Sequence, residues 1–191
     1  MRTVEKKADL RVLRTRAALH EAFNELMEET TLDRITVKTL TERAGINRKT
    51  FYLHFETIEA FYDSIMNGIM DDFFENHETT ADDPYDIDGH ARRFFLFLAS
   101  QPSIVERLIC APGLYDFGER IYRTQMNRYK SVGNPFDWMP SDQEELVKSF
   151  IRNTALDFYR QWVREGKTVP ESTAAQLLSD LTCHGVEHLM R

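Results

Sequence analysis

The 191-residue sequence lacks several features that would place it in a familiar class. It has no run of 18 or more apolar residues, so no segment is expected to span a membrane. Its only two cysteines, Cys110 and Cys183, cannot build a disulfide framework, and we expect free thiols. The N-terminal residues contain neither the apolar stretch nor the cleavage site of a secretory signal. These absences predict a cytoplasmic protein.

Motifs of common enzyme classes are missing as well. The sequence contains no G-x-S-x-G, no P-loop and no G-x-G-x-x-G. His184 and His188 are four residues apart, with Cys183 and Glu187 nearby, but no other cluster with metal-ligand spacing accompanies them. We therefore expect these four residues at an interface or in solvent, and we predict no enzyme activity, no metal and no cofactor.

Positive charge is scarce and unevenly placed. The net charge of −7 would argue against nucleic acid if it were spread evenly. Residues 1–56 carry 11 Lys and Arg against 9 Asp and Glu, whereas residues 57–191 carry 13 against 22. The N-terminal part is therefore compatible with a polyanion, although a solvated basic helix face would give a similar split.

Apolar residues recur at helical spacing along the chain, and no convincing strand alternation is present. We predict an all-α fold with a helix-turn-helix domain at residues 1–56 and a helical domain at 57–191. Ser141 and Glu144 form the sequence pattern of a capping box. Residues 75–88 and 132–140 are expected to be loops. The sequence predicts about nine helices, at about 10–30, 36–44, 47–55, 58–76, 89–101, a short one between Pro102 and Pro112, 114–131, 142–165 and from Pro170 onward.

The most informative segment is ITVKTLTERAGINRKTFYLHF, at residues 35–55. Thr36 and Asn47 are suitable N-caps for two helices, and Gly45 suits the left-handed turn between them. Phe51 and Phe55 are four residues apart and therefore share a helix face, which we expect to turn toward the first helix. This pattern is typical of a helix-turn-helix whose second helix enters the major groove of DNA.

The other side of that second helix carries cationic and hydroxyl side chains. Arginine and lysine can bind guanine O6 and N7, threonine can meet a base edge, and a tyrosine hydroxyl suits a phosphate. Backbone amides at helix starts can also hold phosphates. Two plainer readings stay open: the helix pair is only a structural corner, and His54 only caps or packs. The predicted DNA-binding residues are Thr36, Asn47, Arg48, Lys49, Thr50, Tyr52, His54 and Thr57.

The segment T-V-x-x-L-x-x-x-A-G-I-N-x-x-T-F-Y-x-H-F-x-x-x-E-x-F resembles the signature of the TetR family of transcriptional regulators, and RTRAAL precedes it at the expected distance. The resemblance covers about residues 10–65. Ile58 stands at the second position of the fourth helix, where the family usually has a phosphate-contacting lysine, and Thr31 replaces the glycine that usually ends the first helix. Tyr52, His54 and Arg16 would then contact the phosphate in place of that lysine. Arg14 and Arg16 are expected ahead of the first helix, where they are more readily exposed to solvent than in contact with bases.

The resemblance implies a sequence-specific regulator, expected to be a repressor, that binds palindromic operator DNA as a homodimer and responds to an unknown small-molecule effector. It implies a dimer interface on the last two helices, which we assign to Phe158, Trp162, Leu178, Leu181, Gly185 and Leu189. It also implies an effector pocket, with candidate residues Phe94, Phe97, Tyr115, Tyr122, Phe150, Phe158 and Trp162.

Alternatives remain for the C-terminal part of the chain. The aromatic residues named for the pocket can equally form a plain core. In that case the chain would be a regulator without an effector. A different class of function is a co-regulator whose C-terminal domain binds a protein partner and not a small ligand. Residues 75–88 and Trp138 would be its natural contact points.

Overall fold

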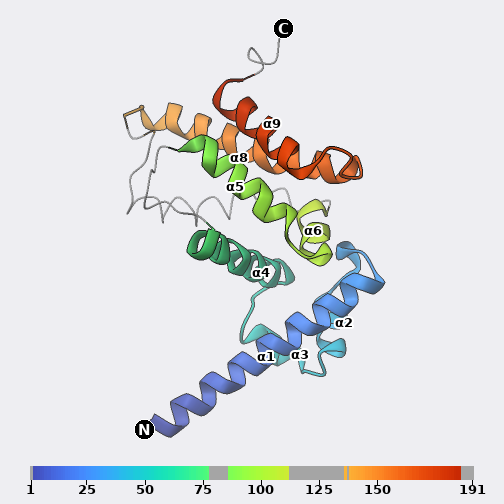
Figure 1. The fold of residues 1–191 in the computed structure, drawn as a ribbon. Helices are drawn as coiled ribbons and strands as arrows, with labels where there is room; N and C mark the ends of the chain where they lie inside the picture. Colours follow the sequence, from blue (N-terminus) through green and yellow to red (C-terminus); the bar gives the residue numbers. More distant parts are fainter. Residues whose placement is uncertain (1, 78–85, 112–135, 137, 186–191) are drawn as a thin grey trace. The chain divides into compact units, whose positions relative to one another are not determined.

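The computed structural model describes residues 2–77, 86–111, 136 and 138–185. Within these residues the chain forms eight α-helices and no β-strand, so the all-α prediction is confirmed (Figure 1). The helix expected at residues 114–131 lies outside the described residues. None of the described helices is long and apolar enough to cross a bilayer.

The chain divides into two compact units, Met1–Ser64 and Ile65–Arg191. The division falls inside α4 (Ile58–Asp72), later than the boundary after residue 56 expected from the sequence. The first turn of α4 belongs to the N-terminal unit because its aromatic residues complete that core. The ring of Phe61 lies 5.7 Å from that of Phe23, centroid to centroid, and Tyr62 Oη donates to the carbonyl of Ile35 over 3.1 Å.

The N-terminal unit contains α1 (Arg2–Glu29), the 3-10 turn η1 (Leu32–Arg34), α2 (Val37–Arg43), α3 (Arg48–Tyr52) and the start of α4. An apolar stripe on α1 forms its core together with one apolar side chain from each of the two short helices. The fully or almost fully buried residues include Leu19, Ala22, Phe23, Met27, Leu40 and Phe51. Burial of this stripe, more than intrinsic helix propensity, accounts for two helices as short as α2 and α3.

α1 begins well before the expected start at Leu10. Residues 2–9 contain no glycine or proline that would stop a helix, so the helix continues toward the N-terminus. Arg14 and Arg16 lie within α1, as the predicted range of about 10–30 already required, and not ahead of it as the resemblance suggested. Both side chains are exposed.

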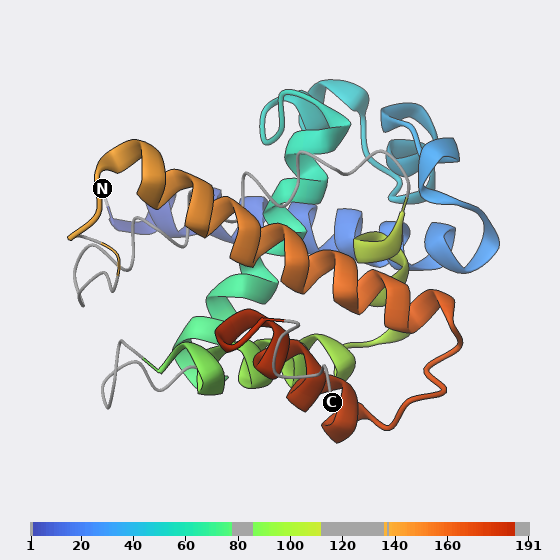
Figure 2. The same cartoon turned by 90° about the horizontal axis from the view of Figure 1, so that it is seen from above.

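The C-terminal unit contains the rest of α4, the π-helical turn η2 (Phe73–His77), α5 (Ile87–Ala99), α6 (Ser103–Cys110), α8 (Ser141–Arg164) and α9 (Glu171–Cys183). Helices α5, α8 and α9 lie side by side in both views (Figures 1 and 2). Phe95 is at the centre of this unit: its ring centroid lies 5.1 Å from that of Trp162 and 5.9 Å from that of Tyr159.

One local prediction in this unit was wrong. Pro140 and not Ser141 is the N-cap of α8, and it makes no side-chain cap hydrogen bond. Glu144, the expected second member of the capping box, forms an ion pair with Lys148 one turn later. Leu96 on α5 is 41% exposed because α5 leaves one side uncovered.

Candidate nucleic-acid interface

The turn between α2 and α3 is fixed by backbone geometry. Thr36 caps α2 reciprocally with Thr39, since each side chain accepts the backbone N–H of the other. Gly45 then adopts φ +65°, and the N–H of Ile46 returns to the carbonyl of Thr41 over 3.0 Å. A Cβ at residue 45 would meet no atom within 4 Å. The backbone conformation, and not lack of space, therefore favours glycine here.

One face of α3 is held by the core. Asn47 caps the helix because its Oδ1 accepts the N–H of Lys49 over 2.9 Å. Phe51 is fully buried, and its ring centroid lies 5.5 Å from that of Phe55. Phe55 in turn lies 5.2 Å from Phe61 in an edge-to-face contact. These aromatic contacts fix both the position and the rotation of α3.

The opposite face of α3 is open. Asn47, Arg48 and Lys49 are exposed, Tyr52 is 55% exposed, and Thr50 and His54 are half-buried, the latter at the end of the following turn. Among the described residues, the side chains of Arg48 and Lys49 have no hydrogen bond or ion pair. Both cationic groups can therefore reach a ligand without breaking an internal contact.

Arg43, at the end of α2, shows the contrasting arrangement. Its guanidinium forms ion pairs with Glu25 at 3.2 Å and Glu29 at 2.6 Å on α1. These hydrogen bonds raise the pKa of Arg43 above its usual value and lower the pKa of Glu29. Arg43 therefore joins α2 to α1, and its charge is already compensated.

Further polar groups lie around α3. Thr57 Oγ1 accepts the N–H of Ala60 over 3.1 Å and so caps α4, while Thr36 caps α2; both threonines are exposed. The guanidinium carbon of Arg16 lies 5.6 Å from the centre of the Phe55 ring, which brings a cation from α1 to the end of the α3 segment. Tyr52 packs its ring edge-on against Phe51 at 5.5 Å. The predicted DNA-binding residues thus lie on one short segment and two adjacent helix starts.

Residues 19–65 match the family model described as bacterial regulatory proteins, tetR family. Through this segment the chain is similar to the TetR family. The HTH-type transcriptional regulator YxbF of Bacillus subtilis (strain 168) is 33% identical over 84 residues, which are 44% of this chain and 22% of that relative. The chain thus matches about a fifth of the relative's length. The dihydroxyacetone kinase operon activator DhaS aligns over 91% of this chain and 97% of its own, at 15% identity and a TM-score of 0.49.

The two departures from the TetR pattern have clear structural settings. Ile58 is half-buried and is the first residue of α4, so the position offers no cation at the start of that helix. Thr31 is exposed and precedes η1 in an extended conformation, with φ −93° and no side-chain cap hydrogen bond. The extended backbone at Thr31 does not require glycine.

Sequence analysis did not single out three residues of this TetR-type unit. Leu53 is 81% exposed directly after Tyr52, and Lys38 is exposed on the first turn of α2. Thr41 is buried, and its hydroxyl donates to the carbonyl of Val37 over 2.7 Å. The burial of Thr41 could have been predicted, because helical spacing places it beside the apolar residues Leu40 and Ala44. The exposure of Leu53 could not, because nothing in the sequence pattern distinguishes it from a buried leucine.

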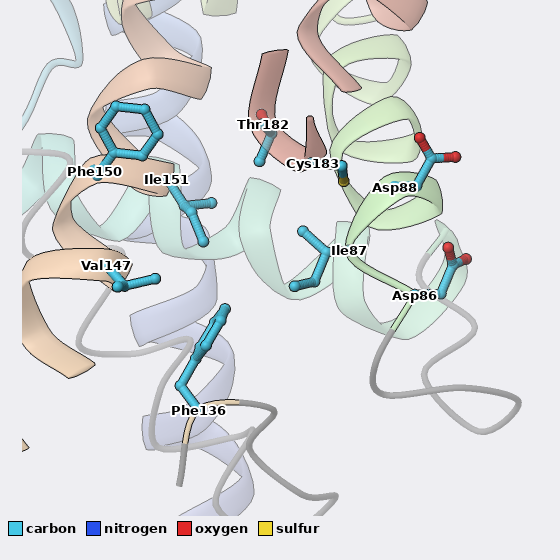
Figure 3. Close-up of a pocket in the computed structure, with 9 residues that line it drawn as sticks. All are labelled: Asp86, Ile87, Asp88, Phe136, Val147, Phe150, Ile151, Thr182 and Cys183. Carbon is cyan, nitrogen blue, oxygen red and sulfur yellow. The ribbon is translucent and has the colours of Figure 1, made fainter. Parts of the chain in front are cut away.

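The residues predicted for an effector pocket are divided by the structure. Phe97 and Trp162 are buried, and Phe94 and Phe158 are half-buried in ring contacts with Phe73 and Phe95 respectively. Tyr115 and Tyr122 lie outside the described residues. Phe150 lines a pocket of about 390 Å³ (Figure 3). A pocket among the other aromatic residues stays a prediction.

The predicted dimer residues differ in their burial within one protomer. Trp162 and Leu178 are 6% and 0% exposed because they pack inside one protomer, so they are core residues of the C-terminal unit. Phe158, Leu181 and Gly185 are half-buried, and Leu189 lies outside the described residues. The large apolar side chains exposed on α8 are instead Leu146 and Phe150, at 73% and 59%.

Proposed function

We propose that the chain is a transcriptional regulator that binds operator DNA through α3. The observation that supports this most is the division of α3 into two sides. Phe51 is fixed in the core, while Arg48 and Lys49 are exposed and their side chains make no hydrogen bond or ion pair among the described residues. A rigid helix that presents cations and a phenol suits base edges and phosphates in a major groove. Arg16, over the Phe55 ring, is proposed as the phosphate contact that replaces the family's lysine.

We further propose that the regulator acts as a homodimer joined through α8. Leu146 and Phe150 are four residues apart, so they form one exposed apolar row on the N-terminal half of this helix. Pairing with the same row of a second copy would remove both side chains from water. A two-fold dimer would place two α3 helices in successive major grooves, about 34–36 Å apart, on a palindromic site.

Repression is the proposed sign of regulation, because a dimer seated on an operator occupies DNA that other proteins would need. The proposed effector changes operator affinity only if it binds the DNA-competent and DNA-incompetent states unequally. A transcription assay from a template that carries the selected operator checks the sign. Lower transcript yield on adding protein supports repression, and higher yield contradicts it.

Selection of bound sequences from a random duplex pool tests the proposal with the full-length protein. We expect enrichment of an inverted repeat whose half-sites are about 10 base pairs apart, or a multiple of that, centre to centre. Sedimentation of the complex should give two chains per site. Absence of any enriched sequence would overturn the proposed function, and enrichment of a single unrepeated half-site would overturn the dimer.

A further inference from the structure

The C-terminal unit contains a pocket between the start of α5, the N-terminal half of α8 and the end of α9, which we call the α5–α8–α9 pocket. Its volume of about 390 Å³ lies in the lower part of the range of small-molecule sites. Ile87, Ile151 and Phe136 point toward a common space, with Val147 beside them (Figure 3). The interior of the pocket is therefore apolar.

Two carboxylates stand at one side of this apolar space. Asp86 and Asp88 are among the lining residues, on the other side of Ile87 from Val147 and Ile151 (Figure 3). Asp86 Oδ1 accepts the N–H of Gly89 over 2.8 Å, and its Oδ2 lies 3.2 Å from Arg93. A Cβ on residue 89 would lie 2.0 Å from Asp86 Oδ2, so glycine leaves room for the carboxylate there. Each carboxylate oxygen has a second acceptor position, so Asp86 can receive a further donor.

Three carboxylates lie near this rim. Arg93 pairs with Asp86, Arg92 and the Ser179 hydroxyl contact Asp88, and Asp180 adds a third negative charge. Burial raises the pKa of the Cys183 thiol, and the same three carboxylates raise it further. Thr182 and Cys183 are at the C-terminal end of α9, where the helix dipole also favours positive charge. The opposing dipole at the start of α5 is offset by Asp86, which is its N-cap.

A small ligand suits this pocket better than a second copy of the chain. Leu146 and Phe150 form the exposed row proposed for dimerisation, and Phe150 also lines the pocket, whereas Val147 and Ile151 are one position further along and turn to an adjacent face. These two side chains are half-buried and face α5 and α9 (Figure 3). α8 can therefore offer Leu146 to a partner helix and Val147 and Ile151 to a ligand, with Phe150 between the two.

We propose that the α5–α8–α9 pocket binds an organic cation with an apolar body, such as an arylalkyl ammonium. The ammonium lies against Asp86 and Asp88, and the apolar body contacts Ile87, Val147 and Ile151. Only the link from this ligand to operator affinity rests on the proposed function. Binding itself is a property of the C-terminal unit.

Two probes with one apolar body and opposite charge test the proposal. Full-length protein without DNA is titrated calorimetrically with 4-phenylbutylammonium and with 4-phenylbutanoate. We expect the ammonium to bind at least about tenfold more tightly, which corresponds to about 1.4 kcal/mol. Equal affinity, tighter binding of the carboxylate, or no binding of either probe overturns the proposal.

Matched variants locate the site. Asp86→Asn with Asp88→Asn removes both charges while asparagine retains the capping role, and we expect it to abolish the preference for the ammonium. Asp142→Asn with Asp157→Asn makes the same charge change at exposed positions of α8 and should leave the preference intact. Loss of preference in both pairs, or in neither, contradicts the assignment.

A chemical readout keeps the result independent of the variants' folding. Cys183 is exposed at the pocket and Cys110 is half-buried elsewhere, so the ammonium should slow maleimide labelling of Cys183 and leave Cys110 unchanged. Equal rates at Cys183 with and without the probe overturn the proposal. An enriched operator without ammonium binding refutes this inference alone, and ammonium binding without an operator refutes only the proposed function.

Discussion

The two units treat their charges differently. In the N-terminal unit, Arg48 and Lys49 are exposed and their side chains make no hydrogen bond or ion pair among the described residues. In the C-terminal unit, cations typically meet carboxylates, as in the pairs Arg93–Asp86, Arg92–Asp88 and Arg160–Asp157. Exposed pairs of this kind contribute little to stability but leave little charge for a polyanion. Charge available for DNA therefore depends on which cations the fold leaves uncompensated, and not on how many the chain contains.

The largest effect is expected where α3 enters the core. Phe51→Ala should lower the free energy of unfolding of the N-terminal unit by about 3–5 kcal/mol, because it leaves a cavity among Phe55 and Phe61. The adjacent exposed Tyr52→Ala should cost far less. Urea titration followed by circular dichroism checks both. A similar loss for the two variants would contradict the two-sided character of α3.

A second test compares uncompensated and compensated cations. Arg48→Ala and Lys49→Ala should each weaken operator binding by about 1–3 kcal/mol if that residue contacts a base, with the unfolding midpoint unchanged. Arg43→Ala removes one cation of the ion pairs with Glu25 and Glu29, and should weaken binding much less. Fluorescence anisotropy with labelled operator measures all three. Full affinity in the Arg48/Lys49 double variant, with the dimer intact, would remove α3 as the reading helix.

Replacing one glycine in each unit by alanine should change the free energy of unfolding in opposite directions. Gly45→Ala should destabilise by about 1–2 kcal/mol, since φ +65° is unfavourable for alanine. Gly68→Ala in the interior of α4 should stabilise by about 1 kcal/mol, because a Cβ there meets nothing within 4 Å and alanine favours the helix. Thermal unfolding of the two variants is the check, and a shift in the same direction for both would be inconsistent with this account.

The smallest expected effect is a pH dependence confined to the N-terminal unit. His20 packs edge-on against Phe61 at 5.5 Å, and burial, with a smaller contribution from Arg16, lowers its pKa below 6.5. The folded state therefore binds a proton less readily than the unfolded chain, so stability is full above about pH 6.5 and falls as the solution is acidified toward the folded pKa. His20→Gln should reduce this fall in urea midpoints between neutral and mildly acidic pH. An identical pH profile in wild type and variant would contradict it.

Much of the N-terminal unit was predictable because its contacts are local. The capping of α2 by Thr36 and of α3 by Asn47, and the left-handed Gly45, depend on neighbours within a few residues. The burial of Phe51 followed from its spacing to Phe55. The start of α1 was not predicted because the prediction followed the apolar residues of the helix. The helix continues through residues 2–9, which have no apolar stripe.

The C-terminal unit was predictable as helices but not as a site. The α5–α8–α9 pocket joins residues near positions 87, 150 and 182, and the sequence gives no rule for which faces of three distant helices meet. Helical spacing predicted that Trp162 and Leu178 would be buried, but not whether their own protomer or a second copy of the chain would bury them. The structure shows that their own protomer does, which left Leu146 and Phe150 as the exposed pair.

Both tryptophans of the chain belong to the C-terminal unit, in unlike surroundings. Trp162 is 6% exposed and donates its indole N–H to the carbonyl of Val169 over 2.8 Å, whereas Trp138 is 74% exposed. Intrinsic indole emission therefore reports on this unit alone, and the unit that carries α3 adds none of it. A shift of that emission on adding operator DNA would therefore show that DNA binding at α3 changes the surroundings of a tryptophan in the C-terminal unit.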